Sequence, residues 1–231
     1  MELIWAGLRQ AIGLLVGLDP EVLGITWLSL RVAGASTGLA LLVGIPLGML
    51  IALARFPGRG LVISLVNTGM GLPPVVVGLF VTIVLWRNGA LGFLELLYTP
   101  TAMIVGQLVI AAPIVTGLTL AAVQQVPEAF RLQMLGLGAS RVQMTWVLLK
   151  EARLPMLAAV MAGFGGVISE VGASMMLGGN IKGSTRVLTT ATVLETGKGN
   201  FDLAIALSVI LLAITFLVNW ALSWIQQRRR V

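Results

Sequence analysis

Cysteine and histidine are both absent from the 231 residues of this sequence. Without cysteine the chain can form neither a disulfide nor a thiolate metal site. Without histidine it lacks the commonest metal ligand and the usual proton shuttle at neutral pH. These absences argue against a metalloenzyme and against a Ser-His or Cys-His hydrolase. The sequence therefore indicates no catalytic residue, no metal ligand and no cofactor.

Charge is also scarce: 10% of the residues are charged, 58% are hydrophobic, and the mean hydropathy is +1.00. So few charges cannot form the polar surface of a soluble domain. A helix that spans a bilayer needs about 20 mostly apolar residues. Five segments meet this requirement, namely 32–54, 61–86, 101–124, 155–177 and 201–225.

Strands with open edges cannot satisfy their backbone groups in lipid. The sequence therefore predicts an all-α fold, a polytopic transmembrane helical bundle in contact with membrane lipid. We expect one transmembrane domain over residues 1–231, with the five core spans between about residues 25 and 225. Residues 1–21 form a further apolar segment that lacks the cleavage site of a signal peptide. We expect this segment to be a retained N-terminal helix, either spanning the membrane or lying in its interface.

Lysine and arginine predict the orientation, because loops rich in these residues stay in the cytoplasm. Three basic clusters follow odd-numbered spans: Arg55 with Arg59, the segment 125–153, and Arg228–Arg230. Placing all three in the cytoplasm fits five alternating spans and puts the linkers 87–99 and 178–200 outside. The net charge of +6 needs no nucleic-acid partner to explain it.

Two candidate spans contain proline, which kinks or interrupts helices. Pro73 and Pro74 lie in the second span and Pro113 lies in the third. A broken helix is tolerated in a membrane where its freed backbone groups are buried or line a cavity. A structural kink and a place in a transport path both remain open for each proline.

The segment 125–153 predicts two short cytoplasmic helices. Pro127 and Glu128 suit the first turn of one helix, which ends at Gly136 or Gly138. A second helix begins around Ala139-Ser140. From these residues alone, Gly138 could be an ordinary helix stop.

Pro127-Glu128 followed by Leu137-Gly138-Ala139-Ser140-Arg141 resembles the EAA loop of ABC-importer permeases. In that family the loop forms a short coupling helix in a groove of the ATP-binding subunit. Two features depart from the family pattern: Leu132-Gln133-Met134 replaces Glu-Ala-Ala, and the Leu-Pro pair comes late, at Leu154-Pro155. The resemblance implies contacts with the ATP-binding subunit for Glu128, Gly138, Ala139, Ser140 and Arg141.

Three further stretches are similar to the molybdate and tungstate permeases: residues 72–78 followed by 86–92, residues 107–113, and residues 168–173 with 178–191 and 195–201. The third, with Ser169-Glu170-Val171-Gly172, looks like the tungstate-specific branch. The resemblance implies a homodimeric permease in the cell membrane that works with an ATP-binding ABC subunit and an extracytoplasmic oxyanion-binding protein. Molybdate or sulfate is the alternative substrate.

No G-x-x-x-x-G-K-[S/T] phosphate loop occurs in the sequence, so we expect a transporter subunit without an ATPase site. A proton-coupled secondary carrier is the alternative from a different class. Such a carrier needs a relay of intramembrane carboxylates or histidines, and Glu170 is the one acidic residue well inside a span. A membrane scaffold that transports nothing would leave the Gly138 segment and the basic linker 178–200 unexplained.

The linker 178–200 combines cations with hydroxyl and amide groups, which together can replace the hydration of a tetrahedral oxyanion. A helix from Ser184 would place Thr185 with Thr189 on one face and Arg186 with Thr190 on another. A solvated loop whose cations dock an acidic binding protein is the alternative. The residues expected in the transport path or outer linker are Pro73, Pro74, Gln107, Glu170, Asn180, Lys182, Thr185, Arg186, Thr189 and Thr190.

Glu170 would repel an anionic substrate, and a charge at mid-bilayer costs about 2.5–3.5 kcal/mol. We expect it to act as a brace for the outer linker. Lys182, Arg186 or the backbone N–H groups of Gly178-Gly179 are its expected partners.

Overall fold

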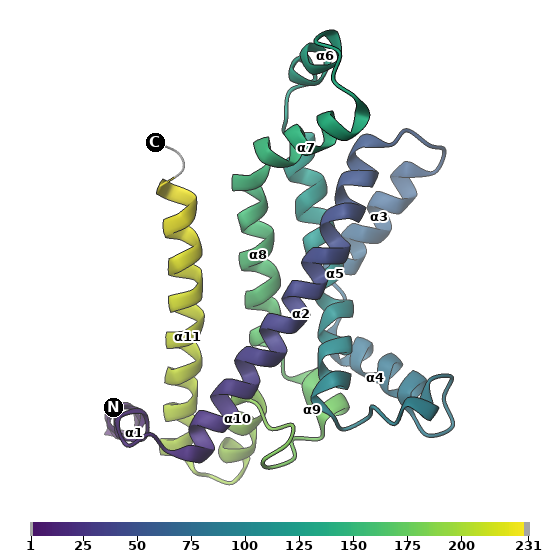
Figure 1. Ribbon diagram of the computed structural model, residues 1–231. Coiled ribbons are helices and arrows are strands. Elements are labelled where there is room, and N and C mark those ends of the chain that lie inside the picture. Colours follow the sequence, from purple (N-terminus) through teal and green to yellow (C-terminus); the bar gives the residue numbers. More distant parts are fainter. Residues whose placement is uncertain (1, 229–231) are drawn as a thin grey trace.

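The computed structural model describes residues 2–228, and this part of the chain contains helices and no strand. The helices are α1 (Glu2–Val16), α2 (Pro20–Leu53), α3 (Arg59–Met70), α4 (Pro74–Leu85), the 3₁₀ helix η1 (Gly92–Leu94), α5 (Pro100–Gln124), α6 (Glu128–Gly136), α7 (Arg141–Glu151), α8 (Arg153–Ile168), α9 (Gly172–Gly178), α10 (Leu188–Gly197) and α11 (Phe201–Arg228). Figure 1 shows their arrangement.

Three of these helices, α2, α5 and α11, are each long and apolar enough to cross a membrane. Two further candidate spans are bent pairs: α3 with α4, bent by 100°, and α8 with α9, bent by 57°. These five units correspond to the five expected spans, so the predicted all-α bundle is confirmed. α2 begins well before the expected residue 32. Its 34 residues reach about 51 Å, longer than a hydrocarbon core of about 30 Å, and it crosses the bundle obliquely (Figure 1).

The N-terminal helix α1 has 15 residues and is about 22 Å long, too short to cross a core of about 30 Å. Figure 1 shows it nearly end-on at the lower left, beside the first turns of α11. A Cβ atom at Gly7 would lie 2.6 Å from Cβ of Ile205, so glycine permits this close packing. The segment was expected either to span the membrane or to lie in its interface, and the structure favours the interface.

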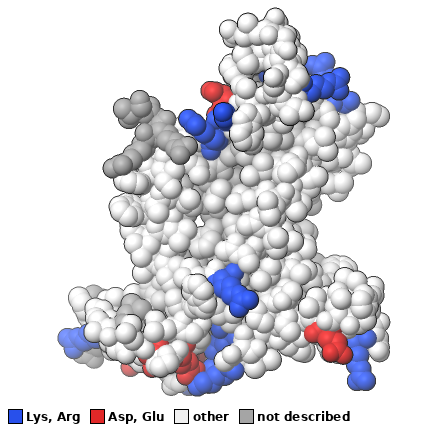
Figure 2. Space-filling view, in the orientation of Figure 1, with Lys and Arg blue, Asp and Glu red and all other residues white. Residues whose placement is uncertain are grey.

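The two ends of the bundle differ in what they carry. One end holds α6, α7, the turn 54–58 and the last turn of α11, and we call it the α7 end (Figure 1). The opposite end, the α10 end, holds α1, α9, α10 and the loop 86–99. Five spans that alternate in direction would place these segments at the same two ends. Figure 2 shows lysine and arginine gathered at both ends, with one isolated basic patch between them. Of the expected C-terminal basic cluster, Arg229 and Arg230 lie outside the described residues.

Proline interrupts one candidate span and leaves the other intact. Pro73 is the N-cap of α4 and Pro74 its first residue, a position where the missing N–H costs nothing. Pro113 lies inside α5, which continues to Gln124, so this proline does not interrupt the third span. α5 packs against α2, α3, α4, α8 and α9. This enclosure holds the helix together across one lost hydrogen bond.

Candidate functional site

The two helix breaks lie next to each other. A Cβ atom at Gly172, the first residue of α9, would lie 2.6 Å from Cγ2 of Val75 near the start of α4. A Cβ atom at Gly78 would lie 2.9 Å from Cα of Ala173. Glycine at both positions lets the backbones of α4 and α9 come into near contact. The second half of each broken span therefore packs on the other, with Pro73 and Pro74 at the junction.

Glu170 lies in the break between α8 and α9, and the residue is 7% exposed. Its Oε1 atom accepts a hydrogen bond from the backbone N–H of Ala173 at 2.8 Å. Its carbonyl oxygen accepts from the hydroxyl of Thr189 at 3.0 Å. The predicted partners of the Glu170 carboxylate are therefore wrong. Within residues 2–228, Lys182 and Arg186 pair with Glu21 instead. The N–H of Gly179 donates to the carbonyl of Met175. Glu170 instead links the segment between α8 and α9 to the first turn of α9 and, through Thr189, to α10.

Gln107 connects three helices in the interior. Its side chain is almost fully buried, with the residue 3% exposed. Its Oε1 atom accepts from the hydroxyl of Ser36 in α2 at 3.1 Å, and its Nε2 atom donates to the hydroxyl of Ser174 in α9 at 3.1 Å. The hydroxyl of Ser29 accepts from the N–H of Leu188 at 2.8 Å. The three serines were not predicted, although Ser29 and Ser36 lie seven residues apart on one helical face, a detectable signal.

The threonine hydroxyls of the linker 178–200 bond within the protein. Thr185 and Thr190 are fully buried. Thr185 donates to the carbonyl of Gly178 and accepts from the N–H of Ile181 at 3.0 Å, and Thr190 accepts from the N–H of Val187 at 3.1 Å. These hydroxyls shape the linker and do not face solution.

The case of a helix from Ser184 does not apply, because α10 begins at Leu188. The N–H groups of residues 184, 185 and 186 all donate to the carbonyl of Ile181 at 3.0–3.2 Å, which closes a turn. Gly183, with a φ of +76°, permits this turn. Thr185 therefore does not share a helical face with Thr189.

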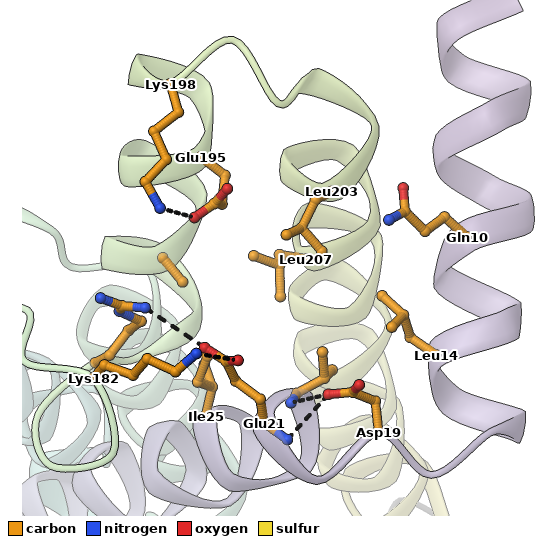
Figure 3. A pocket seen from close by; sticks show the side chains of 13 residues that line it. Gln10, Leu14, Asp19, Glu21, Ile25, Lys182, Glu195, Lys198, Leu203 and Leu207 are labelled. Atoms are coloured by element: carbon orange, nitrogen blue, oxygen red, sulfur yellow. Dashed lines mark hydrogen bonds and ion pairs between the residues drawn. The ribbon is translucent and has the colours of Figure 1, made fainter.

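The cations of the linker are paired with carboxylates around a cavity of about 460 Å³ between α1, α2, α10 and α11 (Figure 3). Lys182 Nζ lies 2.7 Å from Glu21 Oε2, and Arg186 Nη1 lies 3.6 Å from Glu21 Oε1. Arg186 Nη2 also donates to the carbonyl of Asn180 at 3.4 Å, and Asn180 Nδ2 donates to the carbonyl of Thr190 at 3.3 Å. Because both signs of charge line this cavity, it is not a site built for anions alone.

A second pair in the linker involves Glu195, which is 8% exposed. Asn200 Nδ2 donates to Glu195 Oε2 at 2.7 Å, and Lys198 Nζ lies 2.8 Å from Glu195 Oε1. These two hydrogen bonds, that of Asn200 first, lower the pKa of the Glu195 carboxyl below its ordinary value of 4.5. Neither Glu21 nor Glu195 was predicted as a functional residue, because a local sequence pattern does not show which distant cation a carboxylate meets.

The segment between α5 and α8 forms the two helices predicted for it. Gly138 has a φ of +79°, its N–H donates to Leu135 and the N–H of Ala139 donates to Met134, both at 3.0 Å. This is a Schellman motif, which requires glycine or asparagine at the left-handed position. Ser140 then caps α7 in a reciprocal pair with Gln143.

The surface of α6 and α7 is rich in exposed apolar side chains. Five of them are 49–79% exposed: Leu132, Leu135, Leu137, Val142 and Trp146. Exposed apolar patches of this kind mark protein interaction sites. Glu128 lies 3.8 Å from Arg55, and both side chains are mostly exposed, so this pair contributes little to stability.

A helical bundle with two broken spans and a helix–glycine–helix segment at one end has the architecture of an ABC-importer permease. A chain of the inward-facing methionine ABC transporter MetNI has the same fold, with a TM-score of 0.76 at 21% identity over 92% of this chain and 97% of that chain. The chain belongs to the family of binding-protein-dependent transport system inner membrane components, whose pattern matches residues 44–231. It is therefore a multi-pass component of the inner membrane.

Two relatives are similar over nearly the whole chain. The tungstate uptake system permease protein of Peptoclostridium acidaminophilum is 39% identical over 98% of this chain and 100% of that protein. The protein of the same name from Campylobacter jejuni subsp. jejuni is 34% identical over 95% of this chain and 92% of that protein.

Proposed function

We propose that this chain is the membrane-spanning permease of an ABC importer that moves tungstate into the cell. The observation that carries the proposal is the 39% identity to a tungstate uptake permease over 98% of the chain. The fold supports it, because broken spans are tolerated where their freed backbone lines a cavity. Tungstate is a tetrahedral oxyanion, and it would pass between two copies of the chain.

The path in this proposal runs along the junction of the two breaks, where α4 and α9 meet. Pro73 and Pro74 set the direction of α4, and Glu170 joins the break to α9. Gln107 acts on the path indirectly, because it is buried and holds α9 against α2 and α5. A second copy, packed on the exposed apolar faces of α3 and α4, would close the path on its open side.

The ATP-binding subunit docks on α6 and α7 in this account. Their exposed leucines, Val142 and Trp146 offer an apolar surface, and Gly138, Ala139 and Ser140 form a small-residue turn between the two helices. Glu128 and Arg141 lie at the first turns of α6 and α7, where each can meet a charged group of the partner. The chain itself hydrolyses no ATP, since its sequence has no phosphate loop.

The α10 end faces outward and receives the oxyanion-binding protein. Lys182 and Lys198 keep 67% and 50% of their side chains exposed although each pairs with a carboxylate. Two exposed ammonium groups suit an acidic docking surface. Selectivity would then come largely from the binding protein, because a permease must release what it binds.

The test is reconstitution in vesicles with and without the two partners. The purified chain alone is expected to show no ATP hydrolysis. The complete complex is expected to accumulate tungstate only when ATP is present on the α7 side, and a partner subunit with its phosphate-loop lysine replaced is the control. ATP hydrolysis by the chain alone, or accumulation that proceeds without ATP, would overturn the proposal.

The orientation can be tested separately, because the chain has no cysteine background. Ser184 at the α10 end and Gln133 at the α7 end are both exposed. A membrane-impermeant thiol reagent applied outside intact cells is expected to label Ser184→Cys and not Gln133→Cys. The reverse pattern would show that the assignment of the two ends is inverted.

A further inference from the structure

Arg31 lies inside the membrane-spanning helix α2, about 16 Å along the helix axis from Pro20. Within residues 2–228 it is the one lysine or arginine that lies away from the ends of a candidate span. Its side chain is exposed and forms no hydrogen bond or ion pair with any described residue. Arg31 also lies outside residues 44–231, which carry the family match.

None of the described carboxylates is available to pair with Arg31. Glu170 is committed to Ala173, and Glu21 is committed to Lys182 and Arg186. The other described acidic residues lie at helix ends or in loops. A charged side chain within a membrane span is costly unless it is paired, so a charge that persists there indicates a functional partner. Because no described residue supplies that partner, we look for it outside this chain.

The surroundings of Arg31 leave room for such a partner. Gly24 and Gly34 lie on the same side of α2, two turns before and one turn after Arg31, and a Cβ atom at either would meet nothing within 4 Å. Trp27, one turn before, is 69% exposed. An anion can therefore approach this part of α2 without displacing side chains or meeting a competing carboxylate.

We propose that Arg31 binds a tetrahedral oxyanion group in the half of the membrane nearer the α10 end. The guanidinium presents parallel N–H donors that match two oxygens of a tetrahedral oxyanion. Two sources share this chemistry: the transported anion on its way through the complex, and the phosphate of a lipid headgroup. The first source rests on the proposed function; the second does not.

The experiment compares Arg31→Gln, Arg31→Lys and the control Arg9→Gln in the full complex. Arg9 is an exposed cation of α1 without a described partner, so its neutralisation removes a charge near the same end and leaves α2 unchanged. Tungstate uptake is measured in vesicles of phosphatidylcholine with and without phosphatidylglycerol. Retained phosphatidylglycerol is counted by native mass spectrometry of each complex, and the amount of assembled complex is recorded.

If the bound group is the transported anion, Arg31→Gln lowers uptake at subsaturating tungstate roughly tenfold or more in both lipid mixtures. Arg31→Lys restores part of this loss, and Arg9→Gln has no effect. If the bound group is a lipid phosphate, Arg31→Gln loses retained phosphatidylglycerol while uptake in pure phosphatidylcholine stays normal. Arg31→Gln with wild-type uptake and wild-type lipid retention would overturn the proposal. A wild-type complex that takes up no tungstate would contradict the proposed function instead, and the lipid measurement would still test Arg31.

Discussion

Glu21 and Lys182 are 161 residues apart in the sequence, and their side chains meet at 2.7 Å. The same carboxylate reaches Arg186 at 3.6 Å, so the first turn of α2 is fastened to the linker 178–200. The composition of this linker suggested cations that are free to bind an anion. The structure shows instead that Lys182 and Arg186 have a carboxylate of their own chain as partner.

This pairing predicts a modest defect for both Arg186→Gln and Glu21→Gln, and the defect of Glu21→Gln is at least as large because this carboxylate contacts both Lys182 and Arg186. Lys182→Gln is expected to do less than Arg186→Gln, since the Lys182 side chain is 67% exposed and that of Arg186 only 15%. Exposed ion pairs contribute about 0–1 kcal/mol. Thermal unfolding and tungstate uptake of the three variants provide the comparison. Uptake abolished by Arg186→Gln and normal in Glu21→Gln would instead mean that the arginine contacts the anion.

Glu170 is expected to tolerate glutamine better than alanine. A glutamine oxygen can still accept the hydrogen bond from the N–H of Ala173, whereas alanine leaves that donor unpaired in a buried site. Leaving a buried donor unpaired costs about 1–3 kcal/mol. The melting temperatures of the two variants in the complex test this difference. Glutamine as damaging as alanine would show that the negative charge itself is required, and a changed preference between tungstate and molybdate would place Glu170 in contact with the anion.

Substitutions at Gly138 can distinguish an effect of local backbone strain from an effect on the coupling of ATP hydrolysis to transport. Valine at a φ of +79° strains the backbone, whereas asparagine tolerates this conformation. Both add a side chain to the exposed turn between α6 and α7. We expect Gly138→Asn to assemble and to hydrolyse ATP with reduced tungstate uptake, and Gly138→Val to accumulate less protein as well. Gly136→Ala, in open space at the end of α6, is the control. Normal uptake by Gly138→Asn would show that the turn does not transmit the movement.

The lowered pKa of the Glu195 carboxyl predicts that the stability of the protein depends on pH. In the folded protein this pKa is lowered below 4.5 by the hydrogen bonds from Asn200 and Lys198. The stabilisation is therefore fully present above pH 4.5 and is lost as the pH falls through the lower folded pKa. Asn200→Ala is expected to reduce thermal stability at pH 7 and to differ little from the wild type once Glu195 is protonated. A stability difference that stays constant across this range would show that the carboxylate does not control the effect.

The sequence predicted those features that depend on neighbouring residues. Apolar length indicated the five spans, Pro73 and Pro74 indicated the break before α4, and Gly138 indicated the turn between α6 and α7. The break at Glu170 was not predicted as a break, because no proline marks it.

Features that depend on distant contacts could not be predicted. Arg59 begins α3, yet its Nε atom donates to the carbonyl of Ile51 at 2.8 Å and so caps the preceding helix α2. Thr185 is polar and lies in a linker, and it is nevertheless fully buried because the turn closes around its hydroxyl. From the composition, Arg59 and Thr185 were expected to contact solvent or a ligand. In the folded protein both form hydrogen bonds with backbone groups instead.

The central claim is that this chain carries tungstate through the membrane, driven by an ATP-binding partner. Its most direct test is the uptake of isotopic tungstate by vesicles that contain the complete complex, with unlabelled tungstate, molybdate or sulfate as competitor. We expect ATP-dependent uptake that excess unlabelled tungstate abolishes and that equal concentrations of molybdate or sulfate reduce only slightly. Uptake that molybdate or sulfate suppresses as strongly as tungstate does, or no ATP-dependent uptake at all, would contradict the claim.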